Sequence, residues 1–472
     1  MAKEKQKSGK KEPFGSPRGM RDVIDSEYYQ YQGFFEKAAE VAVYYGFKPI
    51  ETPILEKEGV FTSGVGEGTD IIEKETYTLR TKGGDHLALR PEGTASIMRS
   101  YIENGMVAWP QPVMLYYYGP FFRHENPQRG RLRQFHQFGI EMLGTPKSIA
   151  DAIIIRTILV ILEEAGFKNT VLMINSIGDK ECRPAYMRDL VSYYRKHIND
   201  ICADCRERMK KNPLRVLDCK NPKCAPIKQG APQSMSSLCE PCREHFKEVL
   251  EYLEAMNISY RINHHLVRGL DYYTRTVFEI INGEDEQSTE KPDEKNSKEA
   301  GADKAPTPEG VGVPTGSVGK KKDTQKPEPL ALASGGRFDY LAKNLGSKKD
   351  VPGVGGAIGV DRIIMSPKHK PLEPRIMKKP KVYFIQFGFE AKLKSLSIIE
   401  VLRKARIPIM QSLSKDSLGA QLSVAERLKI PYTIIFGQKE ALEGTVIVRD
   451  MNTRSQDTVK IEELTEYIKK MK

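Results

Sequence analysis

RHENPQRGRLRQFHQFGIE, residues 123–141, spans a charged loop between two runs of strand-forming residues. The first run ends just before it, at residues 113–118, and the second occupies residues 135–143. Aromatic and aliphatic residues in such runs favour buried strands, so the stretch predicts two paired strands with a polar connection. Three arginines lie within residues 129–133. That density is typical either of a solvated turn or of a loop that contacts phosphates.

Any phosphate binding in this chain has to rely on side chains. The sequence contains no GxxxxGK[ST] loop, and the glycine-rich segment Gly353–Gly359 does not fit GxGxxG. Arginine is the natural substitute, because its planar guanidinium can donate two parallel hydrogen bonds to a phosphate. Arg123 follows the first strand, and Arg362 lies in GGAIGVDR. Both are candidates, although each alone also fits an ordinary surface or ion-paired arginine.

Length, composition and charge bound the architecture and the partners. A chain of 472 residues is expected to form roughly two to four domains. No apolar run approaches the ~18 residues of a membrane span, and the basic start MAKEKQKSGKKEP leads into no apolar stretch. We therefore expect no membrane segment, no signal peptide and a cytoplasmic location. The net charge of +12 fits a nucleic-acid partner or simply a basic surface.

Changes of composition mark the organisation of the chain. Residues 282–329 are nearly free of large apolar side chains and dense in Lys, Glu, Gly and Pro, which predicts a disordered insertion in a loop. After a Pro- and Lys-rich linker at residues 371–380, runs such as KVYFIQFG and YTIIFG alternate with helical stretches. This alternation predicts a small C-terminal α/β domain with a largely parallel sheet.

All seven cysteines lie between Cys182 and Cys242. Clustering of this kind in a long chain favours metal ligands or free thiols over a secreted disulfide framework. Two CxxC pairs, CADC and CEPC, have a spacing that suits a tetrahedral zinc site. We therefore predict a structural zinc ion, with reduced thiols as the alternative. The predicted ligands are Cys202, Cys205, Cys239 and Cys242.

Six segments resemble the signature motifs of one synthetase family. FRHENPQRGRLRQFHQFGIE (residues 122–141) and GVGGAIGVDRI (residues 353–363) are similar to motifs 2 and 3 of class II aminoacyl-tRNA synthetases. The helix and Pro-containing strand that end at Pro53 are similar to motif 1, the dimer-interface element. RPEGT, LVRGLDYYTRTVFE and GGRFDYL, which begin at residues 90, 266 and 335, resemble the signatures of histidyl-tRNA synthetases.

The resemblance implies an α+β catalytic domain with a mainly antiparallel sheet, a small helical insertion domain, and a C-terminal α/β anticodon-binding domain. The expected bounds are a disordered basic tail over 1–15, the catalytic domain over 16–170 and 262–370 with the disordered insertion at 282–329, the Cys-rich helical domain over 175–261, the linker over 371–380 and the anticodon-binding domain over 381–472.

The resemblance also implies the catalytic and ATP-binding residues. It places Arg123 on the α-phosphate of ATP, Arg362 near the γ-phosphate or the adenine side, and Arg268 near the substrate carboxylate and the α-phosphate. Glu125 is expected to face the adenine amino group or a metal ion. Fixed cations beside a reacting phosphoryl group stabilise the charge that develops there.

Histidine binding and tRNA contact are assigned in the same way. Glu92 and Thr94 are expected at the ammonium group, Glu141 with Tyr273 at the imidazole, and Gln137 on the carboxylate or ammonium side. The full set expected to bind histidine is Glu92, Gly93, Thr94, Gln137, Glu141, Arg268, Tyr272 and Tyr273. The loop expected to contact the tRNA acceptor end contains Gln128, Arg129, Arg131 and Arg133.

The expected activity is that of this family: a homodimeric enzyme that activates L-histidine with ATP and Mg²⁺ and loads it onto tRNA(His). Two alternatives belong to other functional classes. The same fold occurs in a catalytically inactive regulatory subunit of ATP phosphoribosyltransferase, which need not keep Arg123, Arg268 and Arg362. A general basic RNA-binding protein would explain the charge but would leave RPEGT and RGLDYY without a role.

Overall fold

The computed structural model describes residues 14–66, 68–128, 130–283, 331–411 and 417–471. Nearly all of the predicted basic tail and of the predicted insertion lie outside these ranges. The chain divides into two compact units, Met1–Pro374 and Arg375–Lys472, and this division falls inside the predicted linker. Among the described residues, every helix is too short or too polar to cross a membrane.

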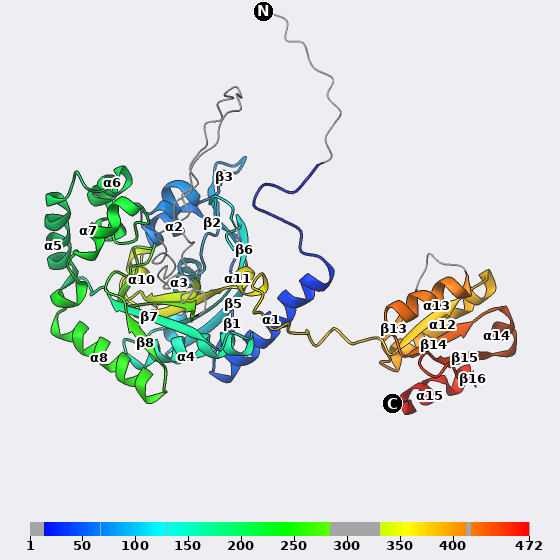
Figure 1. The fold of residues 1–472 in the computed structure, drawn as a ribbon. Helices are drawn as coiled ribbons and strands as arrows, with labels where there is room; N and C mark the ends of the chain where they lie inside the picture. Colours follow the sequence, from blue (N-terminus) through cyan, green and yellow to red (C-terminus); the bar gives the residue numbers. More distant parts are fainter. Residues whose placement is uncertain (1–13, 67, 129, 284–330, 412–416, 472) are drawn as a thin grey trace, which may run out of the picture. The chain divides into compact units, whose positions relative to one another are not determined.

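An eight-stranded sheet forms the centre of the first unit (Figure 1). All neighbours in it are antiparallel except the two outermost pairs, β1 with β5 and β7 with β8. The predicted mainly antiparallel sheet is therefore confirmed. In spatial order the strands are β1 (Lys48–Pro49), β5 (Val113–Phe122), β6 (Gln134–Leu143), β11 (Gly353–Gly359), β10 (Ala331–Arg337), β9 (Thr274–Asn282), β7 (Thr170–Ser176) and β8 (Tyr260–Ile262).

Helices cover one face of this sheet. Phe138, Ile140 and Met142 of β6 point into a core formed with helices α1 (Asp25–Tyr44), α4 (Ile149–Glu164) and α8 (Glu240–Ala255). Because successive side chains of a strand alternate between faces, Gln137, Gly139 and Glu141 must lie on the other side. That second face is approached by α2 (Glu58–Val65), α3 (Thr94–Glu103) and α10 (Leu341–Asn344), as Figure 1 shows.

A small three-stranded sheet was not predicted. It pairs β2 (Leu55–Lys57), β4 (His86–Leu89) and β3 (Thr78–Arg80). Its strands are three or four residues long and largely exposed, so they carry no clear hydrophobic alternation from which to recognise them. The remaining short elements nearby are the π-helical turn η1 (Ile71–Glu75), η2 (Met106–Ala108) and α11 (Val360–Ile364).

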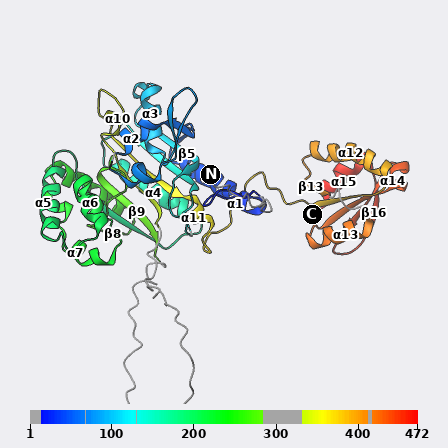
Figure 2. The same ribbon diagram turned by 90° about the horizontal axis from the view of Figure 1, so that it is seen from above.

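The segment between β7 and β8 is the helical, Cys-containing part of the unit. Tyr186, Leu190 and Tyr194 are buried on one face of its first helix at i, i+4 and i+8 spacing. Both ribbon views place α5, α6 and α7 together at one end of the catalytic sheet (Figure 2). Its elements are α5 (Arg183–Lys196), α6 (Ala203–Lys211), η3 (Pro213–Val216), η4 (Pro222–Cys224), α7 (Ala225–Gln229), η5 (Ser234–Ser237) and α8.

The second unit has a five-stranded sheet in the order β13-β12-β14-β15-β16. The first three of these strands are parallel, but β15 and β16 are antiparallel to their neighbours, so the largely parallel sheet was predicted wrongly. Only residues 437–444 separate β14 from β15, and a parallel crossover needs about a dozen. The elements are β12 (Val382–Gln386), α12 (Phe389–Lys404), β13 (Ile409–Gln411), α13 (Leu418–Arg427), β14 (Tyr432–Phe436), α14 (Gln438–Glu443), β15 (Thr445–Asp450), β16 (Gln456–Lys460), η6 (Ile461–Glu463) and α15 (Leu464–Lys470).

Candidate active site

The second face of the central sheet, which α2, α3 and α10 approach, carries glycines where functional side chains lie against the backbone. A Cβ atom on Gly355 would sit 1.6 Å from Glu141 Oε2, and one on Gly139 would sit 2.4 Å from the Tyr117 hydroxyl. Gly355 pairs with Glu141 across β11 and β6, and Tyr117 pairs with Gly139 across β5 and β6. These glycines therefore make room for a carboxylate and a phenol on the floor of a pocket.

Glu92 occupies one wall of this pocket. Its carboxylate accepts backbone N–H bonds from Thr94 (2.7 Å) and Ala95 (2.9 Å) at the start of α3, and a hydroxyl bond from Tyr272 (3.1 Å). Burial raises the pKa of Glu92, and the two backbone donors oppose that shift. Glu92 thus stabilises the N-terminus of α3 and also supplies negative charge to the pocket.

Glu141 is the most deeply enclosed acid of the pocket, with 1% of its surface exposed. Thr94 donates a hydroxyl hydrogen bond of 2.7 Å to Oε1, whereas Oε2 is buried without a hydrogen-bond partner among the described residues. Burial raises the pKa of Glu141 well above its usual range, and the negative charge of Glu92 adds to the rise. A buried acceptor without a partner is costly, so Oε2 is suited to a donor brought by a ligand.

Three tyrosines complete the pocket. The rings of Tyr272 and Tyr273 lie 4.7 Å apart, and a Cβ on Gly336 would come within 2.9 Å of the Tyr273 ring. Burial raises the pKa of Tyr273 to about 12 against the opposing charge of Arg268, so its hydroxyl stays protonated at neutral pH. Tyr117 was not predicted as a site residue. Residues two apart along a strand share a face, so Leu115, Tyr117 and Gly119 lie on one face of β5. This spacing was the sequence signal that could have placed Tyr117 in the pocket.

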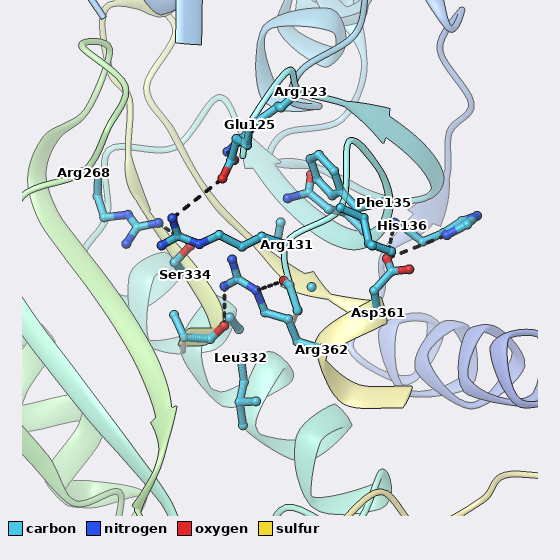
Figure 3. Close-up of a pocket in the computed structure, with 17 residues that line it drawn as sticks. Arg123, Glu125, Arg131, Phe135, His136, Arg268, Leu332, Ser334, Asp361 and Arg362 are labelled. Atoms are coloured by element: carbon cyan, nitrogen blue, oxygen red, sulfur yellow. Dashed lines mark hydrogen bonds and ion pairs between the residues drawn. The ribbon is translucent and has the colours of Figure 1, made fainter. Parts of the chain in front are cut away.

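A second, basic hollow of ≈ 120 Å³ lies on the same face toward Gln137 (Figure 3). The structure brings Arg123, Arg268 and Arg362 together in its lining, as well as Gln137. Arg123 Nε donates to the carbonyl of Pro91 (2.9 Å), and its guanidinium lies 5.4 Å from the Phe135 ring centre.

Arg268 and Arg362 approach the basic hollow from different elements. Arg268 donates to Ser334 Oγ (2.5 Å) and pairs with Glu279 (3.3 Å). Arg362, at the start of α11, donates to the carbonyls of Gly130 (3.1 Å) and Ala331 (2.5 Å). Burial, with a smaller effect of nearby Arg131 and Arg123, lowers the pKa of Arg362 to about 10. Arginines crowded in this way favour a bound anion.

Glu125 lies between two of these arginines. Its carboxylate is 3.8 Å from Arg123 Nη1 and 3.8 Å from Arg131 Nη1, which are long ion pairs rather than close hydrogen bonds. Arg131 also lines the basic hollow, and Figure 3 shows it pointing inward between Glu125 and Arg362. Glu125 is therefore free to turn toward a ligand or a cation.

The other residues of the predicted tRNA-contacting loop occupy different positions. Gln128 and Arg131 exchange backbone hydrogen bonds of 3.1 and 2.9 Å across the tip of the loop. Arg133 lies at its base, where Nε donates to the carbonyl of Glu125 (3.1 Å) and the backbone N–H donates to Gly19 (2.7 Å). Arg129 lies outside the described residues. The role of the loop in tRNA contact stays a prediction.

Two further arginines of the histidine-type signatures have structural partners. Arg90 of RPEGT donates to the carbonyls of Pro120 (2.9 Å) and Thr52 (2.8 Å). Arg337 of GGRFDYL is fully buried and pairs with Asp151 and Asp339 on the helical side of the sheet. These side chains hold the walls of the site together rather than face a ligand.

The cysteines require a correction of the predicted zinc ligands. Cys202 and Cys205 cluster with Cys219 and Cys224, whereas Cys239 and Cys242 cluster with Cys182 and Asp179. The predicted combination of both CxxC pairs in one site was therefore wrong. The pairs lie on different loops, at the start of α6 and the start of α8, and the spacing in the sequence does not reveal which other residues approach each of them.

A mainly antiparallel sheet that carries a basic hollow between its β5–β6 loop and the β11–α11 junction is the arrangement expected from the resemblance to motifs 2 and 3 of class II aminoacyl-tRNA synthetases. Comparisons with known proteins identify the family. Residues 19–180 match the sequence profile described as histidyl-tRNA synthetase, and residues 381–471 match that of the anticodon binding domain. The first match lies within the first unit, and the second spans most of the second unit.

Full-length relatives lead to the same family. Histidine–tRNA ligase of Desulforamulus reducens is 37% identical over 96% of this chain and 98% of its own length. That of Dehalococcoides mccartyi is 37% identical over 97% of this chain and 99% of its own. The apo S. aureus histidyl-tRNA synthetase structure has a TM-score of 0.72 at 27% identity, covering 97% of this chain and all of that one. The chain belongs to the histidyl-tRNA synthetase family.

The regulatory alternative has weaker support. A structure from Bacillus halodurans C, described as an ATP phosphoribosyltransferase regulatory subunit/histidyl-tRNA synthetase, shares the fold at a TM-score of 0.55 and 19% identity. Identity at that level shows the fold alone. The ligases match nearly end to end at 37%, which favours the enzyme.

Proposed function

We propose that the chain activates L-histidine with ATP to histidyl-adenylate and transfers the histidine to the 3′ end of tRNA(His). One observation carries the proposal. A single sheet face has the buried acceptor Glu141 at one end and three arginines near Gln137 at the other. Gln137 and Glu141 lie four residue steps apart along β6, about 13 Å, a span suited to an amino acid joined to a phosphate.

The acidic pocket matches the chemistry of histidine. Glu141 Oε2 can accept an imidazole N–H, and this bond would fix the tautomer of the ring. The protonated Tyr273 hydroxyl supplies a second polar contact for the imidazole, and Tyr272 lines the pocket. Glu92 and Thr94, beside Gly93, receive the ammonium group. An amino acid without a donor at that position would leave Oε2 unpaired.

The basic hollow matches the adenylation step. A carboxylate oxygen of histidine attacks the α-phosphorus of ATP, the bond to the β-phosphate oxygen breaks, and pyrophosphate leaves with its electron pair. Arg123 and Arg268 hold the α-phosphate and the attacking carboxylate in line, and Gln137 supports the amino-acid side. Arg362 holds the γ-phosphate or the adenine side. Preorganised cations of this kind stabilise the charge that grows in the transition state.

Class II synthetases in general use ATP with Mg²⁺, which would offset the charge of the phosphates when bound. Glu125 fits this ion, because its carboxylate lies in the hollow with only long ion pairs to Arg123 and Arg131. Without the ion, the same carboxylate can accept a hydrogen bond from the adenine amino group.

The transfer step requires the acceptor end of the tRNA to reach the adenylate. Gln128, Arg129, Arg131 and Arg133 belong to the loop that we assign to this contact, and the C-terminal unit is assigned to the anticodon. We further propose a homodimer built on the motif 1 region, where Val43 is 57% and Tyr44 85% exposed. Because its substrate is tRNA, we propose that the protein acts in the cytoplasm.

Two assays on the purified full-length chain test the proposed function. Pyrophosphate should exchange into ATP when histidine is added, and a tRNA(His) transcript should accept labelled histidine. Exchange with a different amino acid and none with histidine would overturn the assignment. Exchange without charging would retain activation but refute the transfer step. Sedimentation analysis should find a dimer, and a monomer at assay concentration would refute that part.

A further inference from the structure

We propose that Cys202, Cys205, Cys219 and Cys224 bind one structural Zn²⁺ ion. Their sulfur atoms all lie within 4.8 Å of one another. Cys202 Sγ lies 3.8 Å from Cys219 Sγ, and Cys224 Sγ lies 3.9 Å from Cys205 Sγ. Four sulfurs at about 2.3 Å from a tetrahedral zinc ion would be about 3.8 Å apart, whereas a disulfide bond measures about 2.05 Å. The spacing therefore fits a metal site.

Backbone N–H groups approach two of the four sulfurs. The backbone N–H of Cys202 donates to Cys224 Sγ (3.2 Å), and that of Asn221 donates to Cys219 Sγ (3.4 Å). Such donors orient metal-bound thiolates and offset their charge. Cys205, Cys219 and Cys224 are at most 8% exposed, so the sulfur cage has little room for a water ligand. A closed set of four sulfurs is typical of structural zinc.

The second cysteine cluster is less suited to the same ion. Its fourth member, Asp179, accepts the N–H of Glu181 through Oδ1 (3.0 Å) and pairs with Arg275 through Oδ2 (3.4 Å). Both carboxylate oxygens are thus already engaged within the protein. Cys182 also lies 3.6 Å from Oδ1 as a hydrogen-bond donor. We therefore assign the zinc to the all-sulfur cluster.

The position of the cluster gives the ion a structural task. The segment between Cys205 and Cys219 contains most of α6 and all of η3, and its side chains contact Asp70 and Asp271 of the predicted catalytic domain. Arg208 and Arg215 pair with Asp70 at 3.0 and 3.3 Å. Asn212 donates to Asp271, which directly precedes Tyr272. A zinc ion that fixes both ends of this segment would hold these contacts in place. It would thereby stabilise the residues just before β9, which include Tyr272.

Zinc binding would couple this segment to folding. Each cysteine that binds gives up its thiol proton to solvent, and metal affinity in such sites contributes directly to the stability of the folded segment. The prediction is independent of the activity assignment, because metal content and coordination can be measured without substrate.

The first experiment measures zinc by elemental analysis in full-length protein purified from zinc-supplemented cells. We expect about one equivalent of zinc per chain in the wild type. The double variant Cys219→Ser/Cys224→Ser should contain almost none. The matched control, Cys182→Ser/Cys239→Ser, should keep its zinc. Less than about a tenth of an equivalent in the wild type would overturn the proposal. So would metal retained by the first variant and lost by the control.

A second measurement serves if the first variant does not fold. Zinc-edge X-ray absorption on the wild-type protein should show four sulfur neighbours at about 2.3 Å. Three sulfurs with one oxygen would place the ion at the Asp179 cluster and overturn the assignment. Substitution by Co²⁺ should give sulfur-to-metal charge-transfer bands typical of four thiolates, and their absence would count equally against the site.

Discussion

The two ends of the catalytic sheet face differ in charge and in exposure. At the acidic end, Glu141 and Glu92 are 1% and 4% exposed. At the basic end, the side chains of Arg123 and Arg268 remain 21% and 23% exposed. Because the acidic end is buried, a ligand that lacks a matching hydrogen-bond donor should bind there poorly. The basic end is more exposed, so a large charged substrate can enter it. We infer that selectivity resides at the first end and activation at the second.

Arg337→Met should disturb the acidic and the basic end of the sheet face together. We expect it to lower the free energy of unfolding more than any of the other substitutions. Arg337 lies on β10, the strand that carries Ser334 at the basic end and Gly336 against Tyr273. Its removal leaves buried Asp151 without its main counter-charge, which typically costs about 3–5 kcal/mol. Denaturant unfolding of the full-length protein should measure that loss as a lower free energy of unfolding for the transition of the first unit. Exposed Arg188→Met is the control, and a loss below about 1 kcal/mol would show that the pair is dispensable.

Arg268→Ala should break the basic end alone. Loss of one preorganised cation costs about 2.7–4 kcal/mol of barrier, which is about a 10²–10³-fold loss of kcat/KM for adenylation. Histidine-dependent pyrophosphate exchange measures it, with Arg188→Ala as the control. The unfolding midpoint should change little. Retention of more than about a tenth of wild-type kcat/KM would remove Arg268 from the reacting groups.

Gly355→Ala should damage the acidic end by steric means. The added Cβ would lie 1.6 Å from Glu141 Oε2, so the carboxylate must move. Overpacking of this kind costs about 1–3 kcal/mol. We expect a rise in the KM for histidine with the KM for ATP nearly unchanged. Gly59→Ala on α2 meets nothing within 4 Å and is the matched control. Equal behaviour of the two variants would contradict the pocket geometry.

Glu141→Gln should have a smaller, pH-dependent effect on stability. Burial raises the folded-state pKa of Glu141 above its unfolded value, so wild-type stability is fully present at low pH and is lost as pH rises through the folded pKa. Glutamine does not titrate. The midpoint of Glu141→Gln relative to wild type should therefore increase in thermal melts as the pH rises above the usual glutamate pKa of about 4.3. Exposed Glu244→Gln should show no such trend, and a flat difference for Glu141→Gln would refute the burial argument.

Much of the sheet could be predicted from sequence because its signals are local. The apolar runs at residues 113–118 and 135–143 predict β5 and β6, and the structure confirms their pairing. Strand alternation also predicts that Gln137 and Glu141 share a face. The resemblance supplied Arg123, Arg268 and Arg362, which the structure brings into one hollow. Their individual roles remain proposals.

Other features depend on contacts between distant segments, which no local pattern reveals. Tyr117 becomes a pocket residue only because Gly93 and Gly139 leave space for its ring. The predicted set of zinc ligands was wrong for a similar reason. The path of the chain after Cys205 decides which thiols lie close together. The short strands β2, β3 and β4 pair at an exposed edge where burial imposes no alternation.

Pyrophosphate exchange on wild type, Glu141→Gln and Arg362→Ala in parallel tests the division between the two ends most directly. Glutamine cannot ionise opposite a bound imidazole as Glu141 can, so the substitution should raise the KM for histidine about 10–150-fold, the range for a hydrogen bond to a charged group. The KM for ATP should stay within about twofold. Arg362→Ala should raise the KM for ATP and leave the KM for histidine within about twofold. A Glu141→Gln enzyme with an unchanged KM for histidine, or with equal losses for both substrates, would contradict the account.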